Sequence, residues 1–152
     1  MDKIDDIDKS LIRALQKNAR SSLKDLSNQI NLSLPSTSER LRKLEKNGYI
    51  IGYKVLLDRQ KLGQSITCFC MIVLKEQNFD SEKEFRKLIK QRTEIVECHC
   101  ITGEYEYILK IVTESTRTLE RLLESFREDF SITKSYTYAV LSTIKEEPGF
   151  QL

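Results

Sequence analysis

The side chains best suited to metal or redox chemistry in this 152-residue chain are four cysteines and one histidine. Cys68 and Cys70 form one Cys-X-Cys pair, and Cys98 and Cys100 flank His99 to form the other. Four thiolates suit zinc, but both pairs fall in strand-like segments. In a strand the members of each pair share one face, and His99 points to the other. The alternative to a metal or thiol site is a set of small buried thiols in a core.

A second set of candidate residues lies in LSLPSTSERLRKLEKNGYI, residues 32–50. Ser33 is placed to cap a helix whose first turn would project short hydroxyl side chains toward phosphates or base edges. Cations follow along the outer face, while Leu41 and Leu44 face inward. These hydroxyls and cations are Ser36, Thr37, Ser38, Arg40, Arg42, Lys43 and Lys46. This pattern is typical of a helix that enters the major groove of DNA, and the alternative is an amphipathic helix with a solvated basic face.

Residues 1–50 predict three short helices joined by tight turns. Ile4, Ile7, Leu11 and Leu15 recur every three or four residues behind the acidic start at Asp5 and Asp6. The second helix runs through Leu23, Leu26 and Ile30 and is capped by Ser21 or Ser22, and Asn31 suits a left-handed turn. The third helix runs from Ser33 to Gly48. Such a tri-helical unit raises the expectation of DNA binding, and Arg20, Lys24 and Lys54 could contact phosphates. A strand at 50–57 follows it.

The second half predicts strands and helices in the order β-α-β-β-α-β. The expected segments are 66–75, 81–92, 95–102, 105–112, 119–130 and 132–145. This order is a recurring plan in which a four-stranded antiparallel sheet carries both helices on one face, so the fold class is α+β. In its usual strand order the third strand lies between the first and second, so the two cysteine pairs would be roughly 10 Å apart. That separation argues against zinc, whose sulfur ligands lie about 2.3 Å from the ion.

The first of these strands is apolar on both faces. Cys68, Cys70 and Ile72 alternate with Phe69 and Met71. Because the two helices can cover only one face, something else must cover the second. The sheet of another subunit is the simplest candidate, so we expect a homodimer.

Composition and charge limit the class of protein. The chain is 39% hydrophobic and 32% charged, with no apolar run long enough to cross a membrane and no apolar stretch at its start. We therefore expect a cytoplasmic protein without membrane contact and with reduced cysteines. Residues 1–60 carry 12 Lys and Arg against 8 Asp and Glu, an excess too small to argue for nucleic acid alone. A lone histidine and the lack of a glycine-rich phosphate loop or nucleophile–base pair argue against an enzyme.

Recurring residues and motifs run along almost the whole chain. In the first half they are Asp5, Asp8, Leu11-Ile12, Arg20, Leu26, Leu32-Ser33, Arg40, Leu44-Glu45, Gly48, Ile50 and Leu62-Gly63, and in the second half they are ITGEYEYILKI and SYTYAVLSTIK. In these residues the sequence resembles the Lrp/AsnC, or feast/famine, transcription regulators. The resemblance implies a helix-turn-helix domain (1–50), a connecting strand and hinge (51–64), and a ferredoxin-like effector-binding and oligomerisation domain (65–152). It also implies dimers that pair through their sheets, often assembled into octamers, and control by an amino acid bound between dimers.

The same resemblance implies where an amino-acid effector would bind. Thr102, Gly103, Glu104, Tyr105 and Glu106 would supply backbone amides and an acid for its charged ends, since a glycine permits close backbone approach. Ser135 and Thr137 would add hydroxyls from the last strand. The alternative is a tight hairpin with exposed acids. Two positions depart from the family pattern: Ser27 replaces a usual Ala, and Glu106 replaces a usual Asp, so the effector could differ or be absent.

The sequence thus predicts a sequence-specific DNA-binding regulator with an amino-acid effector and without a resident cofactor. In this interpretation the hydroxyl-rich turn and Arg40 read bases, and the other cations hold phosphates. A metal- or thiol-responsive regulator is the alternative function. An enzyme, or a regulatory subunit of one, that uses an amino-acid-sensing domain is a further alternative from another class.

Overall fold

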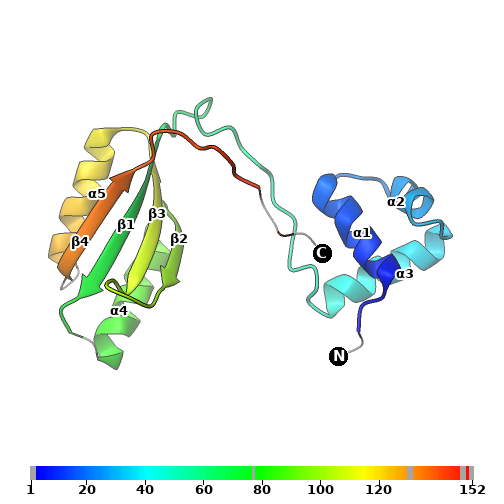
Figure 1. Cartoon of the computed structure of the whole chain (residues 1–152), viewed down its shortest axis with the longest axis horizontal. Coiled ribbons are helices and arrows are strands. Elements are labelled where there is room, and N and C mark those ends of the chain that lie inside the picture. Colours follow the sequence, from blue (N-terminus) through cyan, green and yellow to red (C-terminus); the bar gives the residue numbers. More distant parts are fainter. Residues whose placement is uncertain (1–2, 77, 130–131, 148–149, 151–152) are drawn as a thin grey trace. The chain divides into compact units, whose positions relative to one another are not determined.

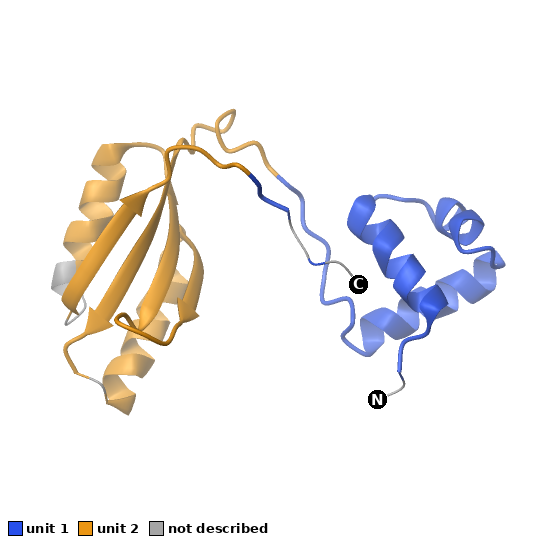
Figure 2. Cartoon of the chain, viewed as in Figure 1, with its two compact units in different colours: residues 1–56, 145–152 blue, residues 57–144 orange. Residues whose placement is uncertain are grey.

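The computed structural model describes residues 3–76, 78–129, 132–147 and 150. The chain divides into two compact units, residues 1–56 with 145–152 and residues 57–144 (Figure 2). Within the described ranges, no helix is both long and apolar enough to cross a membrane.

The first unit is the expected tri-helical domain. It contains α1 (Asp6–Lys17), α2 (Leu23–Gln29) and α3 (Leu34–Lys46) (Figure 1). Asp5 caps α1 and Ser22 caps α2, each in a reciprocal capping box that satisfies exposed N–H groups at the helix start. The three helices bury one apolar cluster formed by Leu11, Leu15, Leu26, Ile30 and Leu44.

The turn between α2 and α3 follows the expected backbone geometry. Asn31 has a φ of 53°, in the left-handed region that Asn tolerates better than most residues. Ser33 then caps α3, and Pro35 lies in its first turn, where the missing N–H costs no helical hydrogen bond. Gly48, with a φ of 74°, follows the end of α3. Local chemistry therefore sets both ends of α3.

The second unit is a ferredoxin-like sheet and helix layer, as predicted. Its elements are β1 (Ile66–Leu74), α4 (Phe79–Gln91), β2 (Ile95–Cys100), β3 (Tyr107–Thr113), α5 (Thr116–Asp129) and β4 (Ile132–Ala139). All strand pairs are antiparallel, in the order β2-β3-β1-β4. Both helices cover one face of the sheet (Figure 1). The order confirms that β3 lies between β1 and β2, while β4 ends at Ala139 rather than at residue 145.

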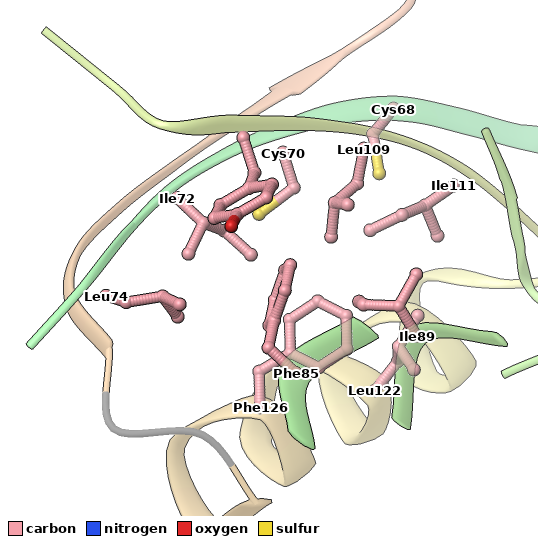
Figure 3. Close-up of a cluster of buried hydrophobic side chains, with 11 residues drawn as sticks. Cys68, Cys70, Ile72, Leu74, Phe85, Ile89, Leu109, Ile111, Leu122 and Phe126 are labelled. Atoms are coloured by element: carbon pink, nitrogen blue, oxygen red, sulfur yellow. The ribbon is translucent and has the colours of Figure 1, made fainter. Parts of the chain in front are cut away.

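The core of this unit lies between the sheet and its two helices (Figure 3). Cys68, Cys70 and Ile72 of β1 are fully buried, and each pairs with a residue of β3 across the ladder. The side chains that complete the cluster are Leu74, Phe85, Ile89, Tyr107, Leu109, Ile111, Leu122 and Phe126. The Phe85 and Tyr107 rings lie 4.5 Å apart between centroids, a distance at which aromatic rings attract. These contacts fix β1 and β3, and with them the loop that precedes β3.

The strand predicted at residues 50–57 is wrong for the single chain, because the described residues there form no strand. Ile51 is 97% exposed and Val55 is 82% exposed. The alternation of apolar side chains is present, but a strand also needs a neighbour to pair its N–H and C=O groups.

Candidate nucleic-acid interface and sensing loop

The outer face of α3 presents most of the predicted DNA-contacting side chains to solvent. Ser36, Ser38 and Arg42 are exposed. The Ser33 hydroxyl accepts from the Ser36 N–H and donates to Ser36 Oγ at 2.9 Å, so it serves the helix cap. This arrangement orders the first turn of α3 and leaves short polar groups and long cations on the surface of the helix.

Thr37 is not part of this surface, which corrects the prediction that its hydroxyl projects outward. Its side chain is fully buried, and Oγ1 donates to the Ser33 carbonyl at 3.0 Å. Residues 37, 41 and 44 follow helical spacing, so Thr37 lies on the same side as Leu41 and Leu44. Thr37 therefore packs α3 against the unit instead of facing DNA.

Arg40 holds α3 to the start of α1. Its Nη1 lies 2.7 Å from Asp5 Oδ2 and 2.8 Å from Asp8 Oδ1. The hydrogen bonds to Asp8 and then Asp5 raise the pKa of Arg40. The pKa of Asp5 is lowered, first by the backbone N–H of Asp8 and then by Arg40. The guanidinium predicted to read a base is thus engaged within the unit.

The remaining cations near α3 are solvent-accessible. Lys43 is 63% exposed and pairs with Glu39, with Nζ 2.9 Å from Oε1. Arg20 lies just before α2 and Lys24 in its first turn, both exposed. Long exposed cations of this kind can contact phosphates beside a helix that occupies a groove.

The predicted sensing loop joins β2 to β3. Gly103 has a φ of 131°, a conformation that L side chains rarely adopt. Glu104 forms an ion pair with Lys134 of β4, whose Nζ also lies 5.0 Å from the centroid of the Tyr105 ring. Tyr105 in turn contacts Tyr136 edge-to-face at 6.4 Å. The loop is thus tied to β4 by charge and aromatic contacts.

Glu106 closes this loop onto β1. Its Oε2 accepts from the Leu74 N–H at 2.9 Å, and its own N–H donates to the Ile72 carbonyl at 3.0 Å. Its carbonyl accepts from the Ile101 N–H at 2.8 Å. The Glu106 carboxylate therefore supports the end of the sheet in this structure.

Ser135 and Thr137 lie on the other face of β4 from the loop contacts. They pair directly with Ile72 and Cys70, whose side chains face the helices, and directly paired residues share a face. Lys134 immediately precedes Ser135 in the strand, so its side chain points to the opposite face of the sheet. The structure thus brings Glu104 and Tyr105 to Lys134, which the sequence prediction missed, and keeps Ser135 and Thr137 apart from them.

Two family models match this arrangement of domains. Residues 4–51 match the winged helix-turn-helix DNA-binding model, and residues 67–150 match the Lrp/AsnC ligand binding domain. The chain belongs to the Lrp/AsnC family of transcriptional regulators. The tri-helical unit is its DNA-binding domain, and the ferredoxin-like unit is its ligand-binding domain.

Relatives in this family match over nearly the full length. The proline dehydrogenase transcriptional activator of Rhizobium radiobacter is 32% identical over 146 residues, covering 95% of this chain and 94% of the relative. The leucine-responsive regulatory protein of Escherichia coli K12 is 32% identical over 144 residues, covering 94% and 88%. The feast or famine regulatory protein of M. tuberculosis, solved in complex with L-methionine, has a TM-score of 0.87 at 26% identity and covers 99% of this chain and 100% of that chain.

The cysteines of this Lrp/AsnC member do not form a common site. Cys70 and Cys98 both pair with Leu109, one from each side, so β3 separates the two pairs. Burial raises the pKa of the Cys68 thiol to about 11 and raises that of Cys70, which disfavours the thiolate that binds metals. In the described part of the chain, no three His, Cys, Asp or Glu side chains could share an ion. Nothing in this geometry favours the metal- or thiol-responsive alternative.

The face of the Lrp/AsnC sheet opposite the helices has an apolar and aromatic centre, beside which Lys110 pairs with Glu97. Met71 lies between Ile108 and Tyr136 across the strands, and Phe69 pairs with Tyr138. Tyr136 and Tyr138 are each about half exposed, and their rings stack at 5.9 Å. This face matches the surface that the sequence assigned to a second subunit.

Proposed function

We propose that this Lrp/AsnC regulator binds specific double-stranded DNA sites through α3 and that an amino acid modulates its binding. The observation that carries the DNA part is the surface of α3. Exposed Ser36 and Ser38 lie near the N-terminal end of the second helix of a helix-turn-helix, the end that such proteins place in the major groove, and exposed Arg42 lies further along this helix.

The contacts to DNA divide into two kinds. Ser36, Ser38 and Arg42 read base edges, and Arg20, Lys24 and Lys43 contact phosphates. Arg40 fixes α3 against α1 through Asp5 and Asp8. This role replaces the base reading expected of Arg40 from the sequence.

The assembly is a homodimer that associates further, with an octamer as the expected form. The apolar face of the sheet supports the dimer, because two such faces would cover each other. A net charge of +2 per chain gives little general attraction to DNA. High affinity therefore comes from several DNA-binding units acting on one duplex. As a DNA-binding regulator, the protein acts in the cytoplasm.

The effector part rests on the loop before β3. L-methionine bound to the M. tuberculosis relative makes this amino acid the first candidate. Backbone N–H groups of Thr102 to Tyr105 would hold its carboxylate. Glu104 already forms an ion pair with Lys134, and its carboxylate would also accept a hydrogen bond from the ammonium group of the bound amino acid. A ligand shifts DNA occupancy only if it binds one assembly state better than another.

The DNA proposal is tested by fluorescence anisotropy on a duplex from upstream of the protein's own gene and on a scrambled duplex, across salt concentrations. Specific binding that falls steeply with salt is expected. Arg42→Ala should weaken specific binding by roughly 1–3 kcal/mol and change binding to the scrambled duplex less. Arg117→Ala, on α5 of the other domain, is the matched control. If the chain binds neither this duplex nor any fragment in a genome-wide selection, the DNA proposal fails.

The effector proposal is tested by calorimetry with L-methionine and then with pooled amino acids. Binding heat is expected, together with a shift of the DNA titration. Gly103→Ala should abolish the heat, because a side chain strains the backbone at a φ of 131°. It should leave DNA binding without ligand intact. Intact DNA binding with no heat from any amino acid would contradict the effector proposal alone.

A further inference from the structure

An acidic side chain stands at the centre of the face that α3 offers to DNA. Glu39 has a 58% exposed side chain. At 3.6 residues per turn it points about 160° away from the buried Thr37, and it lies about 60° around the helix from Arg42. A carboxylate here repels phosphates and weakens general binding. The position of Glu39 on this face therefore affects which DNA bases α3 can recognise.

Lys43 forms an ion pair with this carboxylate. Lys43 Nζ lies 2.9 Å from Glu39 Oε1 on the next turn of the helix. Lys43 lowers the pKa of Glu39, and the charges of Arg42 and Arg40 add to this effect. An ionised carboxylate only accepts hydrogen bonds. In the major groove, the exocyclic amine of cytosine is the donor that Glu and Asp side chains recognise.

On the basis of the proposed docking of α3 in the major groove, we propose that Glu39 is a specificity-determining residue. It accepts a hydrogen bond from the N4 amine of one cytosine in each half-site. Lys43 offsets part of the repulsion between this carboxylate and the DNA phosphates. Ser36 and Ser38 contact neighbouring positions, and Arg42 reads the next base along the groove.

The test is selection of bound duplexes from a randomised pool by the full-length protein. The wild type should enrich a motif with one cytosine per half-site that Glu39→Gln no longer prefers. An amide donates as well as accepts, so Glu39→Gln should prefer adenine at that position and lose cytosine preference about tenfold. All other motif positions should stay the same. Glu120→Gln removes an exposed charge from α5 and should keep the wild-type motif.

Lys43→Met separates base reading from an ion pair that only stabilises the helix. This variant loses the phosphate contact proposed for Lys43, so it should bind all duplexes more weakly, but it keeps Glu39 and should therefore keep the cytosine preference. If Glu39→Gln retains the motif and binds all duplexes more tightly, Glu39 contributes charge alone and the proposal is overturned. If Lys43→Met and Glu39→Gln lose the motif together, the intact pair shapes α3 and direct reading by Glu39 is wrong. A wild type that enriches no motif would instead remove the DNA proposal on which this inference rests.

Discussion

Two hydroxyl residues one position apart on α3 have opposite roles. Ser38 is exposed, whereas Thr37 is buried and donates to the Ser33 carbonyl. We expect Thr37→Val to lower the free energy of unfolding by about 1 kcal/mol, because one partly buried hydrogen bond is lost. Affinity for DNA should stay unchanged well below the Tm. Urea unfolding and anisotropy measure the two quantities.

The matched variant for Thr37→Val is Ser38→Ala. Ser38→Ala removes an exposed hydroxyl, so it should lower specific affinity without changing stability. A loss of affinity in Thr37→Val as large as in Ser38→Ala, at unchanged stability, would restore Thr37 to the DNA surface.

Arg40 acts on DNA binding through the fold of the first unit. Without its guanidinium, Asp5 and Asp8 lose a shared cation at the start of α1, and α3 loses an anchor. Arg40→Ala should therefore lower the Tm and weaken binding to specific and scrambled duplexes by the same factor. Thermal melts and paired anisotropy titrations check this. A selective loss on the specific duplex at unchanged Tm would show that Arg40 reads a base after all.

At the scale of elements, the start of α1 should make the first unit sensitive to acid. The folded-state pKa of Asp5 lies below its ordinary value of 3.8. A depressed acid contributes stability that is present above the unfolded pKa and is lost as pH falls through the folded pKa. The Tm advantage of wild type over Asp5→Asn should therefore be largest above about pH 4 and shrink in more acidic solution.

The control for this pH dependence is Asp6→Asn, one residue away in the first turn of α1. The Asp6 side chain is 97% exposed and forms an ion pair with Lys9 on the same helix. Calorimetric melts of both variants over a series of pH values should show a weaker acid dependence for Asp6→Asn. A Tm difference between wild type and Asp5→Asn that does not change with pH would contradict the stabilising role given to the ionised Asp5 carboxylate.

The elements were more predictable from the sequence than the contacts between them. Ser33, Asn31 and Gly48 mark both the turn and the ends of α3, because capping and left-handed backbone depend on residues nearby. Arg40 pairs with residues more than 30 positions away, and no local pattern shows that. The burial of Thr37, in contrast, was predictable from nearby residues, because its helical spacing to Leu41 and Leu44 places it on the same side of α3.

The outcome at residues 50–57 and the contact between Lys134 and Glu104 could not be predicted from the sequence, for a different physical reason. Alternating apolar residues at 50–57 were visible, but strand formation depends on a neighbour that the single chain does not supply there. Lys134 joins Glu104 only because β4 lies next to β1 and starts at the same end as the loop. Such pairings depend on topology and register, which short windows of sequence do not contain.

At the scale of the whole molecule, the apolar sheet face should hold the dimer together. Met71 lies at its centre, between Ile108 and Tyr136 on the neighbouring strands. Met71→Glu would place a charge in the middle of a buried dimer contact, where its desolvation is costly. We expect this variant to be monomeric at concentrations where wild type is dimeric or larger, as measured by sedimentation velocity.

The loss of the dimer should also weaken DNA binding, since a monomer engages one half-site and loses the gain from linked binding. Lys87→Glu, an exposed change on α4, should keep both the assembly and the affinity. Circular dichroism must show that Met71→Glu keeps its helices and sheet. A folded Met71→Glu variant that remains dimeric would show that the subunits associate through another surface. A folded monomer with undiminished affinity would show that one DNA-binding unit is sufficient.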